Sequence, residues 1–187
     1  MSVVEYIILS IALTIPTMVI MRACALKNRI RLTKGMAFSF LIALEHTLLL
    51  LLGIFLGNML RFDLPEFDNL IYLGFMVAVA LRMFFPAFRK KSKKHTYYDI
   101  SRLSTVMLLG VATGTNTFFV GLGLGFRVLI EHDLWRATIP MMVVMFLFCY
   151  LSIMMGRQKK TMNERKWQLI AVLFLLIFAI KGAFFGD

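Results

Sequence analysis

The chain has 187 residues, of which 60% are hydrophobic and only 17% are charged, and its formal net charge is +11. Soluble domains contain roughly 45–50% apolar residues. A chain of this length cannot bury the additional apolar surface in one core. The composition therefore excludes a water-soluble protein and predicts one that lies in a lipid bilayer. The basic residues flank long apolar runs instead of covering one face of a folded domain, which excludes a nucleic-acid-binding protein.

Six apolar segments follow one another along the chain, and each has about the 20 residues that a helix needs to cross the hydrocarbon core. They extend approximately over residues 3–22, 35–56, 70–88, 103–130, 137–156 and 167–185. Each is expected to be a helix, because an isolated strand would leave its backbone groups unpaired in lipid. The connections are short, so we expect an all-α membrane protein of six transmembrane helices, with residues 1–187 forming a single transmembrane domain.

The loops between these segments alternate in charge. The first, third and fifth loops are strongly basic, whereas the second carries Asp63, Glu66 and Asp68 against the single Arg61. Short basic loops remain in the cytoplasm, so this pattern places the N-terminus and the C-terminus outside. We therefore expect a multi-pass protein of the bacterial plasma (inner) membrane.

The two halves of the chain, about residues 3–95 and 102–187, resemble each other at a spacing of about 100 positions. The matching pairs of short segments are 52–57 with 151–156, 80–82 with 179–181, and 14–17 with 114–117. Three spans per half is an odd number, so the second half must enter the membrane inverted, as in secondary transporters whose solute site lies near the midplane. The alternative is that apolar helices resemble one another by composition alone.

The second segment contains an acidic side chain, Glu45, midway along its apolar run, and His46 follows directly. A carboxylate at that depth must pair with a cation, face water or remain protonated. Glu45 is therefore either a metal or proton site, or a protonated acid that is hydrogen-bonded to a neighbouring helix. His46 offers an imidazole, which suits transition metals. Because consecutive side chains on a helix point about 100° apart, we do not expect Glu45 and His46 to serve one ion together.

The fourth segment carries side-chain oxygens near its middle, and the spacing of Thr113 with Asn116 and with Thr117 puts these oxygens on a shared helix face. In the first segment, Thr14 lies beside Pro16, whose missing N–H frees a backbone carbonyl one turn earlier. Broken helices with exposed carbonyls and side-chain oxygens coordinate dehydrated cations in transporters. The alternative is ordinary helix packing together with a structural kink.

Three glycines follow this cluster in the fourth segment, at Gly121, Gly123 and Gly125. Small residues let the backbones of two membrane helices approach closely. We therefore expect a tight helix contact at this end of the fourth segment.

Taken together, these features resemble the bacterial manganese efflux pumps of the MntP type, within the lysine-exporter superfamily, over nearly the whole chain. The resemblance rests on A-T-G-T-N-T-F-F-V-G-L-G-L-G-F at 112–126, A-L-E at 43–45, R-M at 82–83 and M-G-R at 155–157. It implies six spans in two inverted three-helix repeats, with both ends outside, and an activity that exports manganese.

Three positions depart from the pattern of that family. The aspartates that the family carries in its first and fourth spans fall at Pro16 and Asn116, and its acid at the end of the third span falls at Pro86. Of the membrane acids, Glu45 remains where the family would place one. A divalent cation that leaves water needs formal negative charge nearby, so this set of ligands would bind a divalent ion weakly, a monovalent ion, or none.

The residues and the resemblance lead to the hypothesis of a small secondary transporter that exports a divalent cation. Glu45 would be the charged ligand or proton carrier, and Asn116, Thr113 and Thr14 would be neutral ligands. Manganese is the expected transported substrate, the lipid bilayer is the expected partner, no bound cofactor is expected, and the oligomeric state stays open.

Two alternatives of other classes remain beside that hypothesis. One is a membrane interaction or regulatory protein that has lost transport, and the other is an exporter of a different small solute such as an amino acid. An enzyme is not expected, because the sequence has no arrangement of Ser, His and Asp, no metalloprotease helix motif and no phosphate-binding glycine loop.

Overall fold

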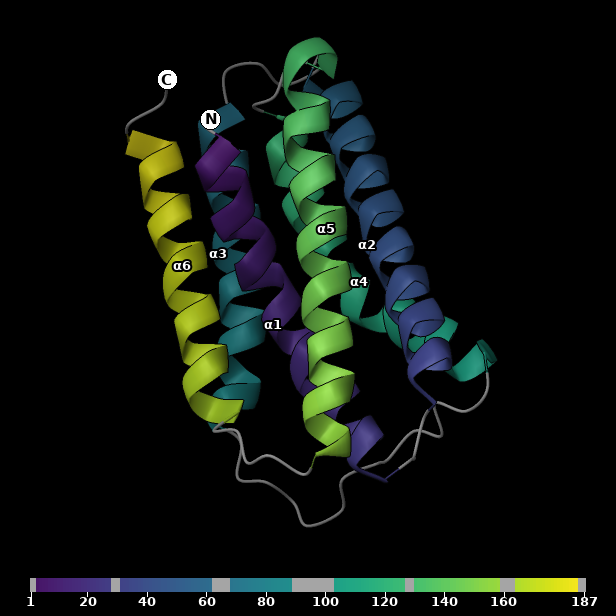
Figure 1. Cartoon of the computed structure of the whole chain (residues 1–187). Coiled ribbons are helices and arrows are strands. Elements are labelled where there is room, and N and C mark those ends of the chain that lie inside the picture. Colours follow the sequence, from purple (N-terminus) through teal and green to yellow (C-terminus); the bar gives the residue numbers. More distant parts are fainter. Residues whose placement is uncertain are drawn as a thin grey trace.

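The computed structural model describes residues 3–27, 31–61, 68–88, 103–126, 130–158 and 164–184, and within these ranges it contains six α-helices and no strand (Figure 1). The helices are α1 (Val3–Lys27), α2 (Leu32–Arg61), α3 (Asp68–Phe88), α4 (Leu103–Gly125), α5 (Ile130–Arg157) and α6 (Glu164–Phe184). The all-helical fold class is therefore confirmed over the described part of the chain. The largest difference in bounds is at α5, which begins at Ile130 instead of near residue 137.

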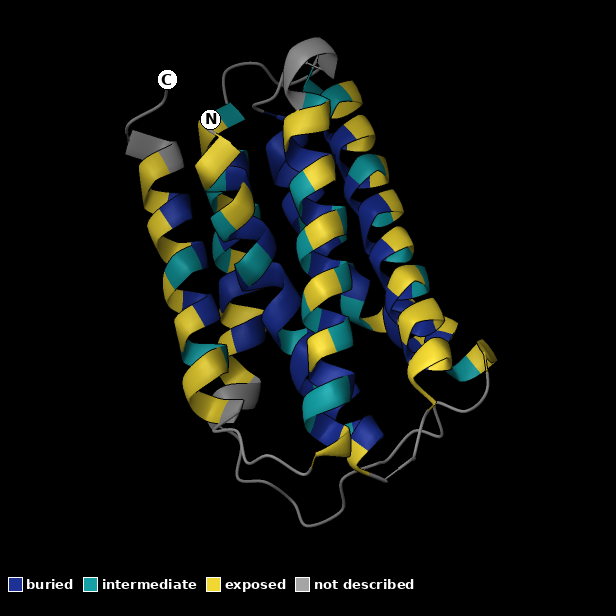
Figure 2. Cartoon of the chain, viewed as in Figure 1, coloured by how far each residue is buried: buried dark blue, intermediate teal, exposed yellow. Residues whose placement is uncertain are grey.

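Five of these helices, α1 to α5, are long and apolar enough to cross a membrane by their length and composition. The side chains of α6 are described only over residues 165–181, a stretch shorter than the 18 residues that such a span requires. Large apolar side chains are exposed on all six helices, with Phe55 and Leu108 among them. Figure 2 shows these exposed residues on the outward faces of the bundle and the buried residues on the inward faces. Such an outer surface is stable in lipid and not in water.

The helices pack in a regular set of pairs. The most extensive contact is between α2 and α4, followed by α1 with α5, α3 with α6, and α2 with α5. Smaller contacts join α1 to α6 and α3 to α4, and α1 touches α4 only over a short stretch. Figure 1 shows that α1 begins and α6 ends at the same end of the bundle.

The contact between α2 and α4 is a close approach of two backbones at paired glycines. A Cβ placed on Gly57 would lie 3.0 Å from the Cα of Gly125, and one placed on Gly121 would lie 3.2 Å from the Cα of Gly53. The same Cβ atoms would also lie within 3.0 Å of the backbone carbonyl oxygens of Leu122 and Leu50, so glycine is required for the observed spacing. The tight contact expected at Gly121 and Gly125 is confirmed, and Gly123 instead approaches α3, where its Cβ would lie 3.3 Å from the Cβ of Phe75.

The contact between α1 and α5 uses small residues in the same way. The Ser152 hydroxyl on α5 donates to the Met18 carbonyl on α1. One turn further along, a Cβ on Gly156 would lie 2.8 Å from both the Arg22 carbonyl oxygen and the Cβ of Ala25. Small side chains thus bring α5 against the backbone of α1.

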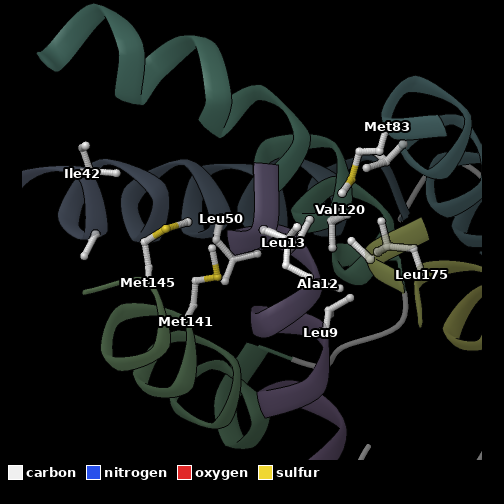
Figure 3. Packing of buried hydrophobic residues seen from close by; sticks show 14 of the residues in the cluster. Leu9, Ala12, Leu13, Ile42, Leu50, Met83, Val120, Met141, Met145 and Leu175 are labelled. Atoms are coloured by element: carbon white, nitrogen blue, oxygen red, sulfur yellow. The ribbon is translucent and has the colours of Figure 1, made fainter. Parts of the chain in front are cut away.

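The core between these pairs is one continuous cluster of buried apolar side chains drawn from all six helices. In Figure 3, Met141 and Met145 of α5 lie near Leu50 of α2 and Leu13 of α1. On the other side of the bundle, the Tyr72 hydroxyl of α3 donates to the Phe178 carbonyl of α6 over 3.3 Å.

The first helix is unbroken, in contrast to the broken helix expected around Pro16. α1 continues from Val3 to Lys27 through this proline. Proline removes one N–H, so the Ala12 carbonyl loses a single backbone bond while the hydrogen bonds before and after it persist. Packing against α5 and α6 holds the rest of the helix together.

Candidate functional site

The imidazole of His46 lies between α2 and α4, and it is fully buried. Its Nδ1 is 2.9 Å from the Thr117 hydroxyl oxygen, and its Nε2 is 3.0 Å from the Thr113 hydroxyl oxygen. Thr113 and Thr117 are one turn apart on α4, so the expectation that they share a helix face is confirmed. The ring therefore joins the two helices through both of its nitrogens.

The hydrogen bonds of Thr113 determine which ring nitrogen carries the proton. The Thr113 hydroxyl donates to carbonyls of its own helix, with the Leu109 oxygen at 2.9 Å and the Gly110 oxygen at 3.2 Å. Its oxygen then accepts the Nε2–H of His46, and Thr117 donates to Nδ1. This assignment follows from the hydrogen-bond pattern, and it leaves His46 neutral with its lone pair on Nδ1.

The carboxylate of Glu45 lies against the backbone of α4 at Gly110. A Cβ on Gly110 would overlap this carboxylate, and its distance to the Cδ of Glu45 would be 2.9 Å. Both carboxylate oxygens are buried, and neither has a hydrogen-bond partner within the described ranges. An ionised carboxyl group without partners is costly in an apolar setting, so the group has to take up either a proton or a cation.

Both polar side chains of α2 point toward α4, but they meet different turns of it, and whether they serve one ion together stays untested. Glu45 reaches Gly110, and His46 reaches Thr113 and Thr117 on the next turns. The absence of a side chain at Gly110 leaves room for the Glu45 carboxylate. Gly114 instead makes room for the side chain of Leu49, since a Cβ there would be in ordinary contact with His46, at 3.6 Å from its Cδ2. No local pattern in the sequence identifies the contacts of His46.

The neutral ligands expected from the sequence are placed differently from one another. Thr113 is in contact with His46. Asn116 is half-buried, and its Oδ1 is buried without a hydrogen-bond partner in the part of the chain that the structure describes. Thr14 is fully buried, but its hydroxyl donates to the Ser10 carbonyl of its own helix at 2.6 Å. No hydrogen bond between described residues links Thr14 to Glu45.

The metal ligands available at this site are few. Across the described ranges, no three His, Cys, Asp or Glu side chains come together in a way that could hold a metal ion. The donors between α2 and α4 are one carboxylate, one imidazole, and hydroxyl oxygens. Pro86, at the third position where the resemblance expected an acid, lies in α3, and its side chain is outside the described set.

Comparison with known proteins places the chain in a family. The family Mntp, described as "Putative manganese efflux pump", matches residues 29–182. Two curated relatives, each called "Putative manganese efflux pump MntP", come from Nitratidesulfovibrio vulgaris strains DP4 and Hildenborough. Each is 26% identical to this chain over 160 residues, which cover 84% of the chain and 77% of the relative. No solved structure matches with significance. Because the family match spans more than four fifths of the sequence, the chain belongs to the Mntp family.

Proposed function

We propose that this protein is a multi-pass transporter of the bacterial plasma membrane that exports a divalent cation, with manganese as the first substrate to test. The observation that carries the proposal is Glu45, a buried carboxylate without hydrogen-bond partners beside the α4 backbone in a bundle with an apolar exterior. The manganese assignment is supported by the family description and by the names of both curated relatives. In this proposal all six helices span the membrane.

The helix pairs support an arrangement of two inverted repeats, α1–α3 and α4–α6. If α1, α2 and α3 are exchanged with α4, α5 and α6, the α2–α4 contact becomes the α5–α1 contact, and α1–α6 becomes α4–α3. The contacts α3–α6, α2–α5 and α1–α4 are exchanged with themselves. The set of helix pairs is therefore unchanged by the exchange, as expected for repeats related by a twofold axis in the membrane plane.

Individual contacts support the same relation. In the first half, a Cβ on Gly53 would meet the Phe118 carbonyl. The residue that corresponds to Gly53 in the second half is Ser152, 99 positions later. Its hydroxyl donates to the Met18 carbonyl, which lies 100 positions before Phe118. The next turn repeats this relation, with Gly57 at the Leu122 carbonyl and Gly156 at the Arg22 carbonyl. Two halves that resembled each other by composition alone would not place corresponding residues against corresponding backbone carbonyls.

The orientation we propose has both termini outside. The start of α1 and the end of α6 lie at one end of the bundle (Figure 1), which is consistent with six crossings. The basic first, third and fifth loops would then lie in the cytoplasm.

At the ion site, Glu45 would supply the negative charge, and Thr113 and Asn116 would supply neutral oxygens. The unpartnered Oδ1 of Asn116 supports its inclusion. Thr14 would join the site only if α1 moved toward α4 during the transport cycle, because its hydroxyl is bonded within α1 and the two helices have little contact. Alternating exposure of such a midplane site on the two sides of the membrane would export the ion.

The test is manganese tolerance in cells that lack their own manganese exporters. We expect the wild-type protein to restore growth at high manganese, and Glu45→Gln and Asn116→Ala to abolish this protection while both variants remain in the membrane at the wild-type level. Full protection by both variants would show that these residues do not form the site.

Flux into liposomes separates the proposal from its two alternatives. The purified protein is reconstituted and tested with manganese, other divalent ions and amino acids. Movement of an amino acid alone would identify a different exporter. No movement of any solute would favour the regulatory alternative, for which the replacement of two expected aspartates by Pro16 and Asn116 is the supporting observation.

A further inference from the structure

The polar groups between α2 and α4 are poor in the hard ligands that manganese prefers. α4 contains no acidic residue, and the acid in the middle of α2 is Glu45. The acid of α1, Glu5, lies in its first turn and is paired with Lys181 of α6. Sites for hard divalent ions are built from several carboxylates, carbonyls and waters. One carboxylate is a weak basis for selecting manganese.

His46 adds a ligand of a different chemical kind, and its geometry suits coordination. The lone pair on Nδ1 points at the Thr117 oxygen at 2.9 Å, and both side chains are fully buried. The Thr117 hydroxyl now occupies the direction in which an ion would lie on Nδ1. A threonine in a helix divides between two χ1 rotamers, so rotation of the Thr117 side chain would free this nitrogen to bind an ion.

The ring stays oriented while this happens. Its Nε2–H is held by Thr113, whose own hydroxyl is bonded to the backbone of α4. A metal-binding histidine whose other ring nitrogen donates a hydrogen bond is fixed in tautomer and direction. The Glu45 carboxylate lies about one turn away along α4, beside Gly110, and supplies charge nearby.

α2 also packs against α5, which carries sulfur-containing side chains near this part of the helix. Ile42 and Leu50 lie one turn before and one turn after His46, and Figure 3 shows Met145 projecting toward α2 between them. The thioether of Met145 is fully buried and accepts a bond from the Cys149 thiol at 3.6 Å. A buried thioether therefore packs against this part of α2 from the α5 side.

We propose that His46 is the residue that determines specificity, and that the site favours borderline divalent cations of the zinc, cobalt and nickel class over manganese. Imidazole suits these ions, and manganese stands at the weak end of the affinity order for a site that contains nitrogen ligands. This inference rests on the proposed export of divalent cations and names the substrate class of the same site.

The experiment is flux of zinc, cobalt and manganese into liposomes that contain the purified full-length protein. We expect the half-saturating concentration of zinc to be about tenfold lower than that of manganese. His46→Asp, which replaces the imidazole with a hard carboxylate, should remove or reverse this preference. The matched control is Thr47→Val, because Thr47 is the next residue on α2 but bonds only the Ala43 carbonyl of its own helix; this variant should keep the wild-type order of ions.

The outcomes separate this inference from the proposed function. Flux in which manganese saturates first would overturn the inference and leave the exporter in place. Flux of none of these ions would overturn the proposed function, and the inference with it. An unchanged zinc preference in His46→Asp would show that another residue determines specificity. The wild-type measurement is decisive by itself if the variant fails to fold.

Discussion

The α2–α4 and α1–α5 contacts are built alike but differ in chemistry. Both bring a helix against its partner's backbone at glycine or serine. In the α2–α4 contact, His46 bridges Thr113 and Thr117. In the α1–α5 contact, Met145 corresponds to His46, and Leu13 and Thr17 correspond to the two threonines. Both contacts are closely packed, whereas the imidazole that bridges two hydroxyls belongs to the first alone among the described residues. Packing and function can therefore be altered separately in this protein.

The largest expected effect concerns the packing that the two contacts share. Gly57→Ala would place a Cβ against the Leu122 carbonyl, and Gly156→Ala would do the same at Arg22. Backbone cannot yield as a side chain does, so each substitution should destabilise the protein by about 3 kcal/mol or more. The measurement is thermal unfolding of the purified protein in detergent.

The matched control for this pair is Gly74→Ala on α3. Among the described residues beyond its own helix turn, none lies within 4 Å of a Cβ at Gly74. The unfolding temperature of this variant should therefore stay at the wild-type value or rise slightly, because alanine is the better helix former. If Gly57→Ala or Gly156→Ala leaves the unfolding temperature unchanged, as this control should, the two helices of that pair do not approach as closely as described.

The second effect concerns the carboxylate at the first contact. Gly110→Ala would displace the Glu45 carboxylate, which is the far end of a flexible side chain. We expect ion flux to fall about tenfold or more, since misplacing one ligand weakens the site, while the unfolding temperature changes little. Flux at the wild-type rate would mean that the position of the carboxylate beside Gly110 is not needed for transport.

The smallest effect is a pair of hydroxyl deletions at corresponding positions. Thr117→Val removes the donor to His46 and leaves a buried ring nitrogen unpaired, which should cost about 1–3 kcal/mol. Thr17→Val removes a buried hydroxyl that has no partner within the described ranges, so this variant should be neutral or slightly more stable. Chemical unfolding of both variants measures the difference, and equal losses would contradict the placement of the two side chains.

The sequence predicts the bundle well because its signals are local or repeated. Apolar length is sufficient to locate the six helices, and the glycines at 121 and 125 are sufficient to predict a tight contact. Which helix packs against these glycines cannot be predicted from the residues around them. That α2 supplies the facing Gly53 and Gly57 follows from the tertiary arrangement alone.

The site is predicted less completely. The depth of Glu45 in an apolar run is enough to single out this residue. The hydrogen bonds of His46 depend on which residues of α4 face it, and this is information from the tertiary structure. Thr14 is the opposite case. Its position near Pro16 predicts a ligand, but its hydroxyl donates to the Ser10 carbonyl of its own helix.

The most direct test of the account is the total metal content of cells grown at high manganese and at high zinc. Strains that lack other exporters are compared with an empty vector, the wild-type protein and Glu45→Gln. We expect the wild-type protein to lower the metal content of the cells and Glu45→Gln to leave it at the empty-vector level. Equal metal content with the wild-type protein and the empty vector, or full export by Glu45→Gln, would contradict it.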